Sequence, residues 1–356
     1  MTLKYTMPSF AAALLSVAIL AAACSSPKEK YTQPKFHEDK NAAVELLTED
    51  QLWGGPAYIF KYADILVVVS SSKDSDCWLH LYSTEGKLLG EFVRTGRGPK
   101  EFSGVSQAYM SGPMLYLMSY MSKTTLAVDV SRLLKECDGA VSRWVSPDDS
   151  NWLSYAFPAS AGNVVAVYRP KANSDVPYEL ARICLFDSDG NAVSTYNESP
   201  YSDYSPRGRS YLEFAMACRT ISPDGKHLAL AANVGAVLEI FSIDNEVEHV
   251  KTSYYVEPQF EENGSNVHTN VKSIAGFGYF YGGNEHLFAV YDGKTSFKDK
   301  RNGWFRNIAV FDWNGEPQKL IKTDWSIEAI VTDDDGNTFY AVVSDPDRRE
   351  YLARLK

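Results

Sequence analysis

Cysteine is scarce in this 356-residue chain, which has five, and no two of them form the Cys-x-x-Cys pair of a zinc site. The cysteines are Cys24, Cys77, Cys137, Cys184 and Cys218. The four that follow Cys24 are widely spaced and show no tight disulfide framework. We expect these four to remain thiols that pack as small apolar side chains, and we predict neither a metal site nor a cofactor.

Basic residues are also in short supply, with 35 lysines and arginines against 45 aspartates and glutamates, a net charge of −10. Such an acidic chain is a poor match for the phosphate backbone of a nucleic acid. The sequence further lacks a Gly-x-Ser-x-Gly nucleophile elbow and a recognisable Ser, His and Asp set. We therefore predict no nucleic-acid partner and assign no catalytic residue.

One long apolar run is present at the N-terminus, where Phe10–Ala23 has the length of a signal-peptide core and is too short to span a bilayer comfortably. Cys24 follows three alanines, in a pattern that resembles a bacterial lipobox. This pattern predicts a signal peptide over residues 1–23 and attachment of lipid to Cys24. The alternative is an ordinary secretory signal cut after Ala23, with Cys24 incidental.

Residues 24–42 are polar and contain two prolines, which predicts a flexible tether behind the lipidated cysteine. Ser25, rather than aspartate, follows Cys24, and by resemblance to other bacterial lipoproteins this favours the outer membrane. The expected location is the bacterial cell envelope, with the protein lipid-anchored in the membrane. Whether it faces the periplasm or the cell surface is left open.

Two turn patterns repeat along the rest of the chain, residues 43–356. The first is a turn followed by a short apolar run, and it recurs near Asp64, Gly112, Gly162, Gly225, Gly283 and Gly336. The second joins two apolar runs through a polar turn, and it recurs around Gly86, Gly190, Asn245 and Gly315. Asp-Gly and Asn-Gly supply the positive φ angles of tight hairpins. Two hairpins per unit predict one all-β domain, a six-bladed β-propeller with four-stranded blades.

The last unit ends at Lys356 after only three expected strands. Leaving its edge open would expose unpaired backbone groups. The run "AVELLT", Ala43–Thr48, supplies the missing strand. We therefore predict that the N-terminal strand closes the ring as the outermost strand of the last blade.

The stretch "VRTGRGPKEF", Val93–Phe102, is glycine-rich but is followed by a strand-like run rather than a helix, so it predicts a connector between blades and not a phosphate loop. The lipobox, this "GRGPKEF" and the hairpin "FDWNGEPQKL" resemble the TolB-like six-bladed propeller lipoproteins of Bacteroides-type bacteria. Lys100 stands where related chains often have glycine. The resemblance implies the fold and says little about activity.

The longest segments are expected on the face opposite the short hairpins, over Tyr196–Tyr211, Thr252–Asn270 and Asp292–Trp304. Long loops on a rigid scaffold commonly carry binding sites, and arginine with aromatic residues suits glycans or protein partners. The candidate ligand-binding residues are Arg97, Arg207, Arg209, His268, Arg301 and Trp304. His268 precedes an expected inner strand, where it could face the central opening.

Two functions remain open on the sequence alone. The first is a non-catalytic propeller, tethered to a membrane through its lipid, that binds a glycan, a peptide or an envelope protein. The alternative is a periplasmic or surface hydrolase or lyase at the mouth of the channel, with a pair of carboxylates drawn from Glu101, Glu213 and Glu328. The fragments "FDSDGN" and "TDDDGN" lack the full ligand set of a calcium loop, so we interpret them as hairpin turns.

Overall fold

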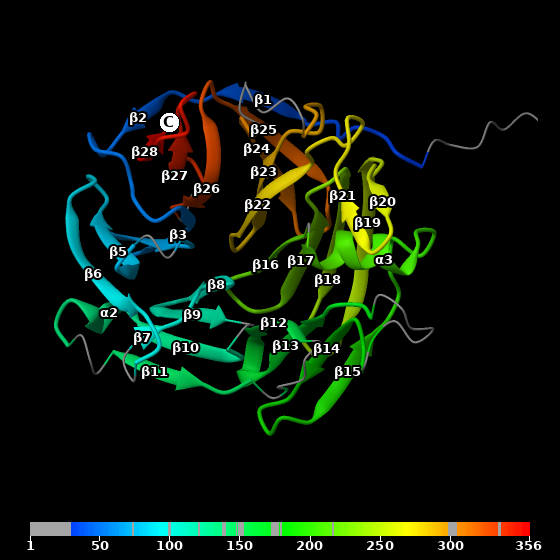
Figure 1. Cartoon of the computed structure of the whole chain (residues 1–356), viewed down its shortest axis with the longest axis horizontal. Helices are drawn as coiled ribbons and strands as arrows, with labels where there is room; N and C mark the ends of the chain where they lie inside the picture. Colours follow the sequence, from blue (N-terminus) through cyan, green and yellow to red (C-terminus); the bar gives the residue numbers. More distant parts are fainter. Residues whose placement is uncertain are drawn as a thin grey trace, which may run out of the picture.

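The structure is a computed structural model of the whole chain. It describes residues 30–356, apart from residues 73–74, 99–100, 120–121, 137–139, 147, 149–152, 172–177, 179, 216, 298–304 and 334–335. Six antiparallel sheets of four strands are arranged around a central axis, as Figure 1 shows. The predicted six-bladed all-β propeller is confirmed.

In each blade the first strand is the innermost and the last is the outermost. Blade one consists of β3 (Pro56–Tyr62), β4 (Ile65–Ser70), β5 (Cys77–Ser83) and β6 (Leu88–Thr95), with the short β7 (Glu101–Phe102) added. Blade two consists of β8 (Gln107–Ser111), β9 (Met114–Ser119), β10 (Thr124–Asp129) and β11 (Val141–Trp144), with the single-turn helix α2 (Val130–Leu133) after β10. Blade three consists of β12 (Leu153–Pro158), β13 (Val164–Tyr168), β14 (Ile183–Phe186) and β15 (Ala192–Tyr196), with the 3₁₀ turn η1 (Ser160–Gly162) after β12.

The second half of the ring follows the same plan. Blade four consists of β16 (Ala217–Ile221), β17 (His227–Ala232), β18 (Ala236–Ser242) and β19 (Glu248–Val256). Blade five consists of β22 (Phe277–Gly282), β23 (His286–Tyr291), β24 (Asn307–Asp312) and β25 (Pro317–Lys322), to which β1 (Glu38–Asn41) is added. Blade six consists of β26 (Ser326–Thr332), β27 (Phe339–Ser344), β28 (Glu350–Leu355) and β2 (Val44–Leu46).

The N-terminal strand closes the ring as predicted. Strand β2 pairs antiparallel with β28, with Val44 opposite Leu355 and Leu46 opposite Ala353. The pairing gives blade six its fourth strand and covers the edge of the sheet that the C-terminal end of the chain leaves open.

Residues 30–42 differ from the expected flexible tether, because they are bound to the propeller. Strand β1 pairs in parallel with β25 and is a fifth strand of blade five. Further upstream, the Thr32 amide donates to the Tyr254 carbonyl at 2.9 Å, and the Phe36 ring lies 5.9 Å from that of Phe311. Lys30 donates to Asp203 of the loop after blade three. No alternating apolar pattern marks this segment in the sequence, because β1 is an exposed edge strand, "EDKN".

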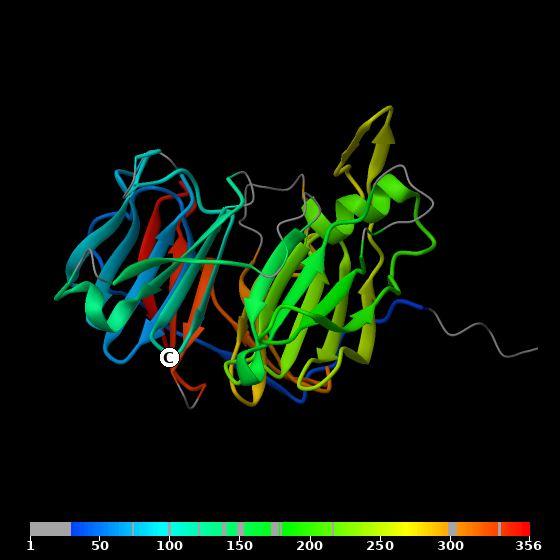
Figure 2. The ribbon, with the colours of Figure 1, turned by 90° about the horizontal axis from the view of Figure 1, so that it is seen from below.

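The two faces of the ring differ in the way the repeats predict. Short hairpins between the first and second strands lie on one face. In the hairpin of blade four, the turn requires a glycine at position 225. Its φ is +71°, and a Cβ there would lie 2.5 Å from the backbone nitrogen of Ser160. The opposite face carries α3 (Pro206–Ser210), the π-helix η2 (Tyr211–Ala215) and the hairpin of β20 (Glu261–Asn263) and β21 (Asn266–His268), which projects from the ring in Figure 2.

The core lies between the blades. The middle strands are apolar on both sides, as in β4, "ILVVVS", because each sheet packs against a neighbour on either face. One apolar cluster joins blades five, six and one, a second joins blades one and two, and a third joins blades four and five. Cys77, Cys184 and Cys218 are free thiols, as expected, and Cys137 lies outside the described residues.

The connector prediction for Val93–Phe102 is also confirmed. Strand β7 pairs in parallel with the end of β6, and Phe102 is buried in the cluster between blades one and two. The carbonyl of Phe102 accepts a hydrogen bond from Trp78 Nε1 at 2.7 Å. No helix follows it, so the stretch passes the chain from blade one to β8 of blade two.

Candidate functional site

The central axis of the ring contains a channel of about 660 Å³, to which the innermost strands of all six blades contribute. Its lining extends from Ala57 and Gln107 to hairpin-turn residues such as Ala63 and Gly283, so the channel reaches the face with the short hairpins. None of its lining residues belongs to α3, β20 or β21. The volume falls within the range of about 300–1,000 Å³ that is usual for small-molecule sites.

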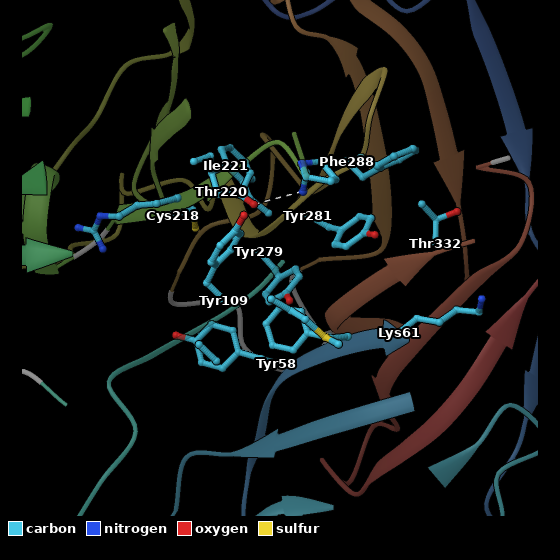
Figure 3. A pocket seen from close by; sticks show the side chains of 18 of the residues that line it. Tyr58, Lys61, Tyr109, Cys218, Thr220, Ile221, Tyr279, Tyr281, Phe288 and Thr332 are labelled. Carbon is cyan, nitrogen blue, oxygen red and sulfur yellow. Dashed lines mark hydrogen bonds between the residues drawn. The ribbon is translucent and has the colours of Figure 1, made fainter. Parts of the chain in front are cut away.

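Ten aromatic side chains line the channel, and Figure 3 shows several of them around the cavity. They are Tyr58, Phe60, Tyr62, Tyr109, Tyr155, Phe157, Tyr279, Phe280, Tyr281 and Phe288. The rings of Tyr58 and Tyr279 lie 6.1 Å apart, and the Tyr279 hydroxyl donates to the Ile59 carbonyl at 3.5 Å. These contacts join blade five to blade one, and burial raises the pKa of Tyr279 well above its ordinary value.

Blades two and three form one continuous aromatic wall of the channel. The Tyr109 ring meets the Phe157 ring edge-on at 5.3 Å, and Phe157 stacks on Tyr155 at 6.3 Å. The guanidinium carbon of Arg219 lies 3.4 Å from the centre of the Tyr155 ring. The wall therefore presents a stack of rings that ends in a positive charge.

Two polar groups on this wall make no hydrogen bond of ordinary geometry within the part of the chain that the structure describes, although the Tyr109 phenol interacts with the Ser111 side chain. They are the Gln107 carbonyl oxygen Oε1 and the Tyr109 hydroxyl, both on β8 and both buried at 8% exposure. Burial of the Tyr109 phenol raises its pKa well above the ordinary value, so the group is a neutral hydroxyl. A buried polar atom without a hydrogen bond costs about 1–3 kcal/mol, which a ligand could recover by bonding to it.

Arg219, on β16, lines the channel and forms hydrogen bonds to the end of the π-helix. Its Nη2 donates to the carbonyls of Glu213 at 2.8 Å and Phe214 at 3.4 Å. Burial lowers the pKa of Arg219 from its ordinary value, because the guanidinium has lost much of its hydration. Single π-turns are frequent at functional sites, so an arginine bound to one makes this wall a candidate binding surface.

The carboxylates that the sequence offered as a catalytic pair do not come together. Glu101 accepts a hydrogen bond from the Gly98 amide at 2.8 Å and so stabilises the connector. Glu213 is buried between blades three and four, and only Glu328 of the three lines the channel. Glu328 accepts a hydrogen bond from the Ser344 hydroxyl at 2.7 Å. Its hydrogen-bond partner therefore belongs to the same blade, blade six.

Blade six contains a different carboxylate neighbourhood. Burial, together with the charge of Glu328, raises the pKa of Glu350 to about 7. Glu350 lies on β28 opposite Ser344, the residue that binds Glu328. The two carboxylates therefore lie on either side of one serine, with Glu350 partly protonated near neutral pH.

A buried ionic network links blades three and four. Arg182 donates through Nη1 to Glu239 Oε1 at 2.8 Å and through Nη2 to the other carboxylate oxygen, and its Nε lies 3.6 Å from Glu213. Glu213 also accepts hydrogen bonds from Tyr178, at 2.7 Å, and from Ser199. Burial raises the pKa of Glu239, while the Arg182 charge opposes the rise. The network fixes the π-helix to the ring.

The predicted ligand residues are placed away from the channel. Arg207 donates to the Gly264 carbonyl, so it holds the β20–β21 hairpin against α3. His268 is exposed on β21, with Nε2 at 3.5 Å from Glu261. The inner strand β22 follows it in the chain, as expected, but His268 itself does not line the channel. Arg209 lies on α3 and Arg97 is exposed in the connector.

The remaining sequence-based candidates lie outside the described residues, and these are Cys24, Arg301 and Trp304. Among the described residues, no three histidine, cysteine, aspartate or glutamate side chains are grouped as a metal ion would require. Within the same part of the chain, no helix has the length and apolar character to cross a membrane. The fragment "FDSDGN" is a turn, as expected, in which Asp187 accepts hydrogen bonds from the amides of Asp189 and Asn191.

Gln107, Tyr109 and Arg219 were missed from the sequence. All three belong to the first strands of their blades. The sequence signal that could have indicated a channel wall was the recurrence of tyrosine in the strands that precede the repeated turns. Such tyrosines are also typical of buried strands, so the pattern does not separate a channel wall from a core.

The ring and its channel define a six-bladed β-propeller with an aromatic central cavity. The model of the TolB-like 6-blade propeller-like family matches residues 173–335 of the chain. This match confirms the resemblance to TolB-like six-bladed propellers that the sequence predicted.

Two solved structures share the fold. One is a Bacteroides fragilis protein named as exported, which is 13% identical with a TM-score of 0.52, over 90% of this chain and 98% of that protein. The other is a member of the DUF4221 family from Bacteroides vulgatus, which is 8% identical with a TM-score of 0.52, over 89% of this chain and 96% of that protein. No curated protein matches the chain in sequence.

Proposed function

We propose that this chain is an exported lipoprotein of the bacterial cell envelope, anchored in the outer membrane through Cys24, that binds a glycan in its central channel without cleaving it. The similar protein from Bacteroides fragilis, named as exported, supports export. The alanines before Cys24 support the lipid anchor.

The observation that carries the binding proposal is the unpartnered Gln107 Oε1 on the aromatic wall of the channel. Sugar hydroxyls are donors that can satisfy such an acceptor, and the C–H faces of sugar rings pack on aromatic side chains. The Tyr109 hydroxyl offers a second buried polar group two residues along the same strand. A hydroxyl-rich ligand with apolar faces therefore matches this wall better than an extended peptide, whose own amides pair most readily with strand edges.

The experiment is a glycan-array screen of the purified mature protein, followed by calorimetry with the tightest glycan. Gln107→Leu replaces a buried amide whose Oε1 lacks a partner by an apolar group of similar size. The melting temperature should therefore stay equal or rise, while affinity falls by roughly 10-fold or more. Ser154→Ala is the matched control, because Ser154 Oγ is also buried without a partner among the described residues but does not line the channel.

Two results would contradict the proposal. The first is the absence of binding to any glycan. The second is equal affinity of the wild type and Gln107→Leu for the glycan that binds. Chromatography of the glycan after prolonged incubation with the protein tests the claim that the glycan is not cleaved. Shorter or unsaturated products would show that the protein is a hydrolase or a lyase instead.

A further inference from the structure

The charge on Arg219 is not balanced by a carboxylate. Within the described part of the chain, no ion pair joins Arg219 to an acidic side chain, and the nearby Glu213 and Glu239 are paired with Arg182 instead. Its hydrogen bonds to backbone carbonyls both leave from Nη2. The Arg219 side chain also forms a hydrogen bond with the Tyr155 side chain. Because a guanidinium has five N–H donors, donors remain on Arg219 for another acceptor.

A desolvated charge without a counter-charge is costly, and a protein keeps one most readily where a bound anion completes it. The face of Arg219 that stacks on Tyr155 is already covered, at 3.4 Å. Its remaining donors lie in the plane of the guanidinium, which is the arrangement that binds carboxylate or sulfate oxygens two at a time.

We propose that Arg219 binds an anionic group, a carboxylate or a sulfate, on the glycan that occupies the channel. The inference rests on the proposed function, because it names the class of glycan for the same site. Gln107 and Tyr109 then bind sugar hydroxyls on the wall, and Arg219 selects acidic over neutral sugars.

The other charged groups of the channel lining set how much negative charge the ligand can carry. Lys61, Glu285, Glu328 and Asp333 also line the channel, so carboxylates there outnumber the two cations. Repulsion by these carboxylates opposes a ligand with a charge on every sugar. The site therefore suits a glycan with one acidic sugar among neutral ones rather than a uniform polyanion.

The test uses an array that carries uronate-containing, sulfated and neutral oligosaccharides, followed by calorimetry with the tightest ligand and with its carboxyl-reduced or desulfated counterpart. The wild type should bind the acidic form roughly 10- to 100-fold more tightly than the neutral form, as expected for hydrogen bonds to a charged group. The uronate and sulfate arms identify which anion is recognised.

Substitution of the arginine separates recognition from structure. In Arg219→Gln the preference for the acidic form should vanish, and Arg219→Lys should retain part of it, since lysine keeps the charge and loses the fork. A merely structural arginine would lower both affinities by the same factor. Arg132→Gln is the matched control, because Arg132 is exposed on α2 and pairs with Glu136 at 2.5 Å.

The outcomes distinguish this inference from the proposed function. If the array binds only neutral glycans, or if acidic and neutral forms bind equally, the anion site is wrong while glycan binding stands. The same holds if Arg219→Gln keeps the full preference for the acidic form. If no glycan binds, both proposals fail.

Discussion

Val44 and Leu355 are opposite each other in the outermost pair of strands of blade six, so the N-terminal strand β2 and the C-terminal strand β28 hold one another. The pairing includes reciprocal hydrogen bonds between Ala43 and Lys356, at 3.0 and 3.1 Å. Upstream of this pair, the arm of residues 30–42 contacts blade four through Thr32 and Tyr254 and blade five through β25 and Phe311. Closure of the ring and attachment of the arm are therefore separate contributions to stability.

Truncation from the N-terminus should reveal these two contributions in turn. A variant that starts at residue 43 loses β1 and the Phe36 contact, and we expect its melting temperature to fall by several degrees relative to a variant that starts at residue 30. A variant that starts at residue 50 also loses β2 and exposes the edge of β28, so it should melt lower still. Differential scanning calorimetry measures both steps. Equal melting of the variants starting at 43 and 50 would show that β2 does not close the ring.

The buried pair of Arg182 and Glu239 should be sensitive to loss of one partner. Arg182→Ala leaves two buried carboxylates uncompensated, and we expect it to lower the free energy of unfolding by about 3–5 kcal/mol. The double variant Arg182→Met, Glu239→Leu removes one charge of each sign and should lose less than Arg182→Ala. Chemical denaturation of the three proteins gives these values. A double variant that is as unstable as Arg182→Ala would contradict the ionic origin of the effect.

Glu350 should make stability depend on pH. Its pKa is raised in the folded protein to about 7, above the ordinary value of 4.5, because of burial and the Glu328 charge. A raised pKa means that the folded state holds the proton more tightly, so the stability it contributes is complete below pH 4.5 and is lost as pH rises through 7. Glu350→Gln should therefore flatten the fall in melting temperature between pH 4.5 and 7.5. Glu257→Gln, at an exposed position, is the control and should leave the fall unchanged.

The residues opposite the channel mouth should be dispensable for channel binding. Arg207 and His268 belong to the layer formed by α3, β20 and β21, which does not line the cavity. We expect Arg207→Ala and His268→Ala to change glycan affinity less than about two-fold, although Arg207→Ala frees the β20–β21 hairpin from one hydrogen bond. A ten-fold loss of glycan affinity in His268→Ala would indicate that the glycan binds on that face and not in the channel.

The fold could be predicted because its signals are local and repeated. Hairpins such as the one at Gly225 combine a turn residue of positive φ with flanking apolar runs, and every blade carries such a turn. Closure by β2 followed from counting strands. The strand β1 could not be predicted in this way, because "EDKN" is exposed and is held by backbone pairing with β25, which leaves no apolar pattern.

The site was harder to predict for a physical reason. Loop length and arginine content drew attention to Arg207 and His268, whereas the cavity is formed where inner strands from separate blades meet. Gln107 and Arg219 stand far apart in the sequence, and only the curvature of the ring places both on the channel. A lone glutamine or arginine in a strand carries no sign of an unpartnered atom, since partners are set by tertiary packing.

The most direct test of glycan binding in the channel is a crystal structure of the protein with the tightest glycan from the array. We predict density for a sugar against Tyr155, with a hydroxyl at about 2.7–3.2 Å from Gln107 Oε1. A sugar bound instead on the face formed by α3, β20 and β21, with the channel free of glycan, would contradict the central claim.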